Sequence, residues 1–123
     1  MLRKIGAVIA ALVAWTIVVT GLNLGLRYGF PGYAAVEKAM TFTLAMMWAR
    51  LTISFVATLS AGAVTAWVAR DRLAWPLVTG VVLLAIFIPV HMSIWTHFPL
   101  WYHLTFLPSL PILSVVGGRL VRP

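Results

Sequence analysis

Four long apolar stretches dominate this sequence, and none of them contains an aspartate or a glutamate. They cover about residues 5–26, 49–69, 73–95 and 99–118. A helix needs about 20 apolar residues to cross the hydrocarbon core of a bilayer, and each stretch is close to that length. Only 9% of the residues are charged, which leaves too little polar surface to coat a soluble core. The sequence therefore predicts an all-α membrane protein, a four-transmembrane-helix bundle that forms one domain over residues 1–123.

The distribution of lysine and arginine predicts how the bundle is oriented. Cytoplasmic loops of membrane proteins carry an excess of these residues. On the four-span arrangement, one side holds six of them: Arg3, Lys4, Arg70, Arg72, Arg119 and Arg122. The other side holds Arg27 and Lys38, with Arg50 at its boundary. We expect a multi-pass protein of the cell membrane with both termini in the cytoplasm (N-in/C-in).

The net charge of +7 follows from the same residues, so it does not indicate a nucleic-acid partner. The apolar run that follows Lys4 is longer than the 7–15 residues of a secretory signal core, and we interpret it as an uncleaved first span. The segment over residues 33–49 has apolar residues at helical spacing. It either extends the second span outward or lies in the membrane interface.

Two rows of small residues predict close contacts between helices. Such rows let helix backbones approach in lipid, where packing replaces the hydrophobic driving force. The first row is in the second span and comprises Ser54, Thr58, Gly62 and Ala66; the second is Gly21 and Gly25 in the first span. These rows pack either inside one bundle or against a second copy or another membrane protein. The expected partners are therefore the lipid bilayer and, in the second case, a homo-oligomer or a membrane-protein partner.

The inventory of reactive residues excludes several classes of enzyme and transporter. Cysteine is absent, which excludes disulfides and thiolate chemistry. The only two acidic residues, Glu37 and Asp71, are expected on opposite sides of the membrane, so they cannot act together on one substrate. Coupled transport commonly needs a carboxylate inside a span, and none is present. The small multidrug efflux pumps have this size and span number, but their glutamate in the first helix is missing here.

A layer of histidine, arginine and tryptophan at the outer boundary is the candidate ligand-binding site. By helical rise, His91 and His103 fall at the same depth on two spans joined by a short turn, with His97 in that turn. Trp95 and Trp101 close the layer toward water, and Arg50 borders it from the second span. Arg50 either extends to lipid phosphates or serves a buried function.

Three interpretations of this layer remain open. The histidines are hydrogen-bonded interfacial residues without a ligand, or His91 and His103 ligate haem or a transition metal, or the layer forms a pocket for a quinone or a lipid headgroup. The first interpretation needs no cofactor.

The stretch HFPLWYHLTFL at residues 97–107, followed by Pro111 and by Gly117-Gly118-Arg119-Leu120, resembles small four-span inner-membrane proteins of bacteria. The resemblance covers the last third of the chain. It implies a bacterial inner-membrane location and four spans, and it transfers no activity and no catalytic residue.

Three functions are compatible with these features. The leading hypothesis is a non-enzymatic helical bundle or accessory subunit. The alternatives are a haem-, metal-, quinone- or lipid-binding protein that uses the outer histidine and arginine layer, and a small uncoupled transporter or channel. The last is disfavoured because no span carries a polar stripe to line a path.

Overall fold

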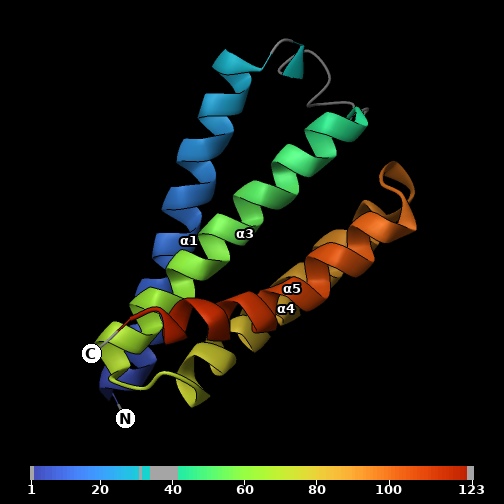
Figure 1. Cartoon of the computed structure of the whole chain (residues 1–123). Coiled ribbons are helices and arrows are strands. Elements are labelled where there is room, and N and C mark those ends of the chain that lie inside the picture. The colour runs from blue at the N-terminus through green and yellow to red at the C-terminus, as the bar shows by residue number, and fades with distance from the viewer. Residues whose placement is uncertain (1, 31, 34–41, 122–123) are drawn as a thin grey trace.

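The computed structural model describes residues 2–30, 32–33 and 42–121. Within these residues the chain forms four long helices: α1 (Leu2–Gly29), α3 (Leu44–Ala69), α4 (Ala74–Ser93) and α5 (Leu100–Arg119) (Figure 1). A short 3₁₀ helix, η1 (Trp95–His97), lies between α4 and α5. Each of the four long helices in the described part of the chain is long and apolar enough to span a membrane. The predicted all-helical, four-span architecture is confirmed at this level.

The second span begins earlier than the sequence predicted, at Leu44 rather than residue 49. The Thr43 side chain accepts a hydrogen bond from the backbone N–H of Met46 at 3.3 Å and so caps the first turn of α3. Residues 44–49 therefore extend the second span. Residues 34–41, which include Glu37 and Lys38, lie outside the described residues. Helix α1 also exceeds its predicted range at both ends.

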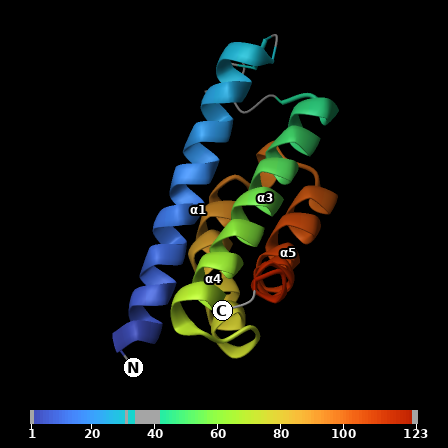
Figure 2. The same cartoon turned by 60° about the vertical axis from the view of Figure 1, so that its left-hand side comes forward.

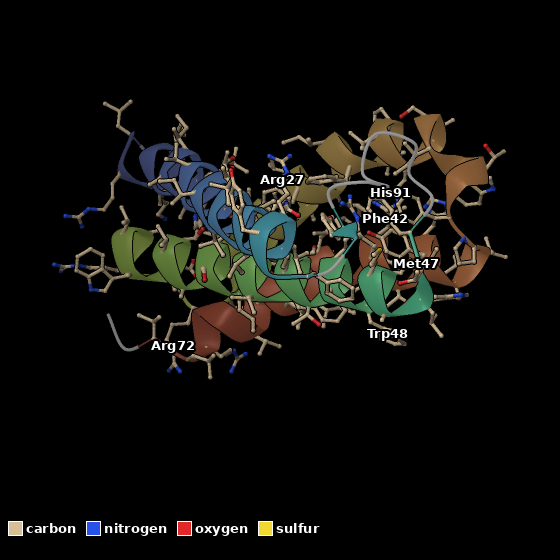
Figure 3. The ribbon with its side chains drawn as sticks, turned by 90° about the horizontal axis from the view of Figure 1, so that it is seen from above. Arg27, Phe42, Met47, Trp48, Arg72 and His91 are labelled. Atoms are coloured by element: carbon tan, nitrogen blue, oxygen red, sulfur yellow. The ribbon has the colours of Figure 1, made fainter. Side chains whose placement is uncertain are left out.

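The bundle has two distinct ends. The first and last described residues and the α3–α4 connection lie at one end, called here the terminal end, and η1 lies at the opposite end (Figures 1 and 2). Asp71 marks the terminal end, where its Oδ1 accepts hydrogen bonds from the backbone N–H groups of Leu73 and Ala74 at the start of α4. Figure 3 shows the neighbouring Arg72 at this end and His91 toward the other.

Helix α3 is central to the packing. It packs against α1 on one side and against α5 and α4 on the other, while α1 packs far less against α4. Figure 2 shows α3 between α1 and α5. Helices α4 and α5 form an antiparallel hairpin, as expected from the short turn between them.

Glycines allow the backbones of α3 and α5 to touch. A methyl group added to Gly62 would lie 1.9 Å from the carbonyl oxygen of Ser114, and one added to Gly117 would lie 2.1 Å from that of Leu59. The other members of the predicted row on α3, Ser54, Thr58 and Ala66, are also buried. By contrast, a methyl group on Gly21 or Gly25 would meet nothing within 4 Å. Their predicted packing role therefore has no counterpart within the described chain, and a contact with another chain stays a prediction.

Candidate functional site

A cavity of about 200 Å³ lies among the four helices, in the half of the bundle away from the terminal end. All four helices contribute to its wall, and α1 and α3 contribute most. The lining residues are Trp15, Val19, Asn23, Arg50, Ile53, Ser54, Phe87, Tyr102 and Phe106. Most of the lining is aromatic or aliphatic, with a few polar groups, which is the usual composition of a small-molecule site.

Arg50 lies at the polar end of this cavity and is held by a tyrosine. Its Nη1 donates a hydrogen bond to the Tyr33 hydroxyl at 2.9 Å. That hydroxyl donates in turn to Oδ1 of Asn23 at 3.4 Å. The Tyr102 hydroxyl is a further polar group beside the guanidinium. Three separate parts of the chain thus converge on one arginine.

Two aromatic rings also hold Arg50 in place. Its guanidinium carbon lies 4.7 Å from the centroid of the Phe42 ring and 5.7 Å from that of Phe98. Aromatic faces attract cations, most strongly where water is excluded. The arginine therefore points into the bundle rather than outward to lipid phosphates, because a phenol and two ring faces are available inside.

Two hydrogen-bond donors at the cavity have no partner. Arg50 Nε and Ser54 Oγ are both buried, and neither makes a hydrogen bond. Residues 50 and 54 are one helical turn apart on the same face of α3, so both groups face the same region. Asp71, the acidic residue among those described, accepts hydrogen bonds from the start of α4 at the terminal end, far from Arg50. Among the described residues, Arg50 consequently has no carboxylate partner.

Trp15 forms the deep side of the cavity. Its indole Nε1 donates to the Thr58 hydroxyl at 3.1 Å, and this hydroxyl donates to the Ser54 carbonyl oxygen at 2.7 Å. The Trp15 ring also packs against the Phe87 ring, with centroids 4.9 Å apart. Trp15 therefore links α1 to both α3 and α4.

His91 and His103 form a hydrogen-bonded pair next to the cavity. Their Nδ1 atoms are 2.6 Å apart, and both side chains are buried. His103 Nε2 lies 3.1 Å from the carbonyl oxygen of Trp95. Because a carbonyl oxygen only accepts, His103 carries its proton on Nε2 and accepts at Nδ1, so His91 donates from Nδ1. Two neutral imidazoles therefore explain both contacts, the one between the rings and the one to the Trp95 carbonyl oxygen.

Ligation of a metal or haem by His91 and His103 stays a prediction, and it would need a different arrangement of the two rings. Two nitrogen ligands each bind a metal ion at about 2.0–2.1 Å, which places tetrahedral ligands more than about 3 Å apart. At 2.6 Å the two Nδ1 atoms share a proton instead. The described residues also contain no group of three or more histidines and carboxylates arranged to hold a metal ion. Ligation by His91 and His103 would require the two rings to separate.

Of the predicted site residues, some line the cavity and others do not. Arg50 lines the cavity, whereas His91 and His103 lie behind it, with His91 packed on Phe106 at a centroid distance of 4.5 Å. Trp95 stacks on His103 at 4.3 Å, and Trp101 stacks on Trp48 at 5.4 Å, so neither lines the cavity.

Sequence reasoning missed Trp15, Asn23, Tyr33 and Tyr102 as site residues. Asn23 carried a usable signal, because an amide inside an apolar span is costly unless it has a role. Tyr33 carried no comparable signal, since tyrosine is common at membrane interfaces.

Comparison of the chain with protein-family models, with curated proteins and with solved structures found no match. The functional conclusion therefore depends on the geometry of the cavity.

Proposed function

We propose that this chain is a multi-pass membrane protein that binds an anionic ligand in the cavity, with Arg50 as the principal contact. The observation that carries the proposal is the buried Nε of Arg50, which has no partner and lies one turn from the equally unpartnered hydroxyl of Ser54. Both groups donate hydrogen bonds, so they are complementary to an acceptor such as a carboxylate or phosphate oxygen.

The electrostatics of the site favour an anion over a neutral carbonyl compound. An arginine inside a membrane span is costly unless a partner compensates its charge. Tyr33, Phe42 and Phe98 supply only dipoles and ring faces. A bound oxyanion would supply the missing charge, and charge-assisted hydrogen bonds are about twice as strong as neutral ones.

The same proposal places the cavity in the outer half of the membrane. Among the described residues, the terminal end carries Arg3, Lys4, Arg70, Arg72 and Arg119, as the bounds of the helices show. This excess supports a cytoplasmic location for the terminal end. The cavity, which lies in the other half of the bundle, would then face the outer leaflet.

Analysis of molecules that co-purify with the protein tests the proposal. The full chain is purified in nanodiscs, extracted with organic solvent and analysed by mass spectrometry, alongside Arg50→Gln. We expect an anionic compound that is enriched with the wild type and depleted at least tenfold with Arg50→Gln, because the substitution removes the charge. Arg70→Gln is the matched control, since Arg70 lies at the terminal end, and it should retain the compound.

Glu37 is the one acidic residue outside the described part of the chain, so Glu37→Gln is included as a second control. Retention of the compound by Glu37→Gln supports a ligand rather than an internal carboxylate as the partner of Arg50. Identical anionic extracts from the wild type and Arg50→Gln would overturn the proposal.

A further inference from the structure

The cavity changes from polar to aromatic with depth. Asn23 and Arg50 lie at its polar end, nearest to the η1 end of the bundle. Trp15 is eight residues from Asn23 along α1, which corresponds to about 12 Å by helical rise. Because Trp15 is the fourteenth of the 28 residues of α1, the aromatic end lies at the middle of that helix. A ligand that fills the cavity has its charged group near the end of the bundle and an apolar part at mid-depth.

The cavity is partly open, and α1 and α4, which both line it, pack less against each other than α3 packs against either of them. Helix α1 contributes Trp15, Val19 and Asn23 to the lining, whereas α4 contributes Phe87. These two helices pack little against each other, and the tilted contact between Trp15 and Phe87 bridges them. In a membrane the space beside this contact is occupied by lipid chains, so an apolar chain could pass there without meeting water.

The two buried donors without a partner indicate the class of headgroup. Tyr33 accepts one of the five guanidinium hydrogens of Arg50, and the Arg50 Nε–H and the Ser54 hydroxyl are buried donors without a partner. A carboxylate has two oxygens and can accept one hydrogen bond at each from these donors. A phosphate would bring further oxygens, for which the mostly apolar wall offers few additional donors.

We propose that the ligand is a long-chain carboxylate that enters from the lipid between α1 and α4, past Trp15. This inference rests on the anion site proposed above and adds the class of the ligand and its route. A cavity of about 150 Å³ holds a benzene molecule. The cavity of about 200 Å³ therefore holds a carboxylate and the first carbons of one chain, and the remainder extends into the bilayer.

Binding of radiolabelled oleate to the full chain in phosphatidylcholine nanodiscs tests the ligand class. Saturable binding is expected, with displacement by unlabelled oleate and weaker displacement by octanoate. Millimolar acetate should not compete, because it lacks the chain. Arg50→Gln should weaken oleate binding at least tenfold, and Ser54→Ala should weaken it several-fold.

The outcomes separate this inference from the proposed function. If acetate displaces oleate as well as octanoate does, the chain has no role and the inference fails, while the anion site stands. If dodecyl phosphate binds more tightly than dodecanoate, the carboxylate assignment is wrong. If no anion binds saturably to the wild type, both proposals fail.

The absence of cysteine in the sequence allows a direct test of the route. Val19→Cys places a thiol in the cavity wall, and Ile17→Cys, at a position 66% exposed on α1, is the matched control. A lipid-soluble maleimide should label both, whereas a water-soluble, membrane-impermeant one should label neither. Oleate should protect Val19→Cys and leave Ile17→Cys unprotected. Labelling of Val19→Cys by the water-soluble reagent, or equal protection of both thiols, would overturn entry from the lipid.

Discussion

At the scale of single residues, two buried serines differ in whether the hydroxyl has a hydrogen-bond partner. Ser54 is buried in the cavity wall and has no hydrogen-bond partner. Ser114 is equally buried, but its hydroxyl donates to the carbonyl oxygen of Pro76 at 2.6 Å and so joins α5 to α4. A buried polar group without a partner costs about 1–3 kcal/mol, whereas a satisfied one contributes about 1 kcal/mol.

Alanine substitution of these serines should therefore have opposite effects. Ser54→Ala should raise the free energy of unfolding of the ligand-free protein by about 1 kcal/mol, because it removes an unsatisfied hydroxyl. Ser114→Ala should lower it by a similar amount, since the Pro76 carbonyl then loses its donor. Unfolding in mixed micelles with increasing dodecyl sulfate measures both. A decrease in stability for Ser54→Ala would indicate that its hydroxyl has a partner in the protein.

Residue-scale reasoning from the sequence reached only part of the site. Helical rise predicted that His91 and His103 share a depth, and the structure places them in contact. The direction of Arg50 was not predictable in the same way. A long side chain at a membrane boundary can extend to water or turn inward, and the choice depends on Tyr33, Phe42 and Phe98. These residues come from three separate segments, whose convergence is a tertiary property.

At the scale of the elements, the predicted row of small residues on α3 makes its closest contact with α5. Gly62 and Gly117 each face a backbone carbonyl of the other helix. The sequence predicted which face of α3 is small but not which helix would pack on it, because a row of small residues carries no information about its partner. It predicted the existence of each helix reliably, since apolar length alone decides that.

Adding one methyl group at two glycines tests the importance of this contact. Gly62→Ala should lower the free energy of unfolding by about 2 kcal/mol or more, because the new Cβ would lie 1.9 Å from the Ser114 carbonyl oxygen and force the helices apart. Gly21→Ala has open space and should be neutral or stabilising by up to about 1 kcal/mol, through helix propensity. The same dodecyl sulfate titration compares them. Equal effects would show that α3 and α5 are not in backbone contact. A loss of stability confined to Gly21→Ala would instead point to a partner on α1.

At the scale of the whole molecule, the four long helices of the described residues alternate in direction, and both ends of the chain lie at the terminal end. The turn containing η1 lies at the other end, close to the cavity. This arrangement fixes which segments share a side of the membrane, but the side itself follows only from the distribution of basic residues.

Reporter fusions test the orientation. A reporter that is active only in the cytoplasm should be active after Pro123 and within residues 70–72, and inactive near Phe98. The reason is the excess of arginine and lysine at the terminal end. A reporter active only outside the cytoplasm, fused at the same positions, should give the reverse pattern and serves as the control. Cytoplasmic activity at Phe98 would invert the orientation and place the cavity in the inner leaflet.

The sparse burial of α1 has a consequence for how the protein is made. Only Ala7 and Ala11 are buried in this helix, and its mean hydropathy of 2.3 is the highest of the four. During synthesis α1 leaves the ribosome first and must stay in lipid before α3 exists, which an apolar surface on nearly every side permits. Helix α5 has the lowest mean hydropathy, 1.3, and carries His103 and Ser114, which are buried against the other helices. It is synthesised last, when α3 and α4 are already in place to receive it. The most apolar of the four helices thus precedes the helix that packs on it, and the least apolar one follows the helices against which it packs.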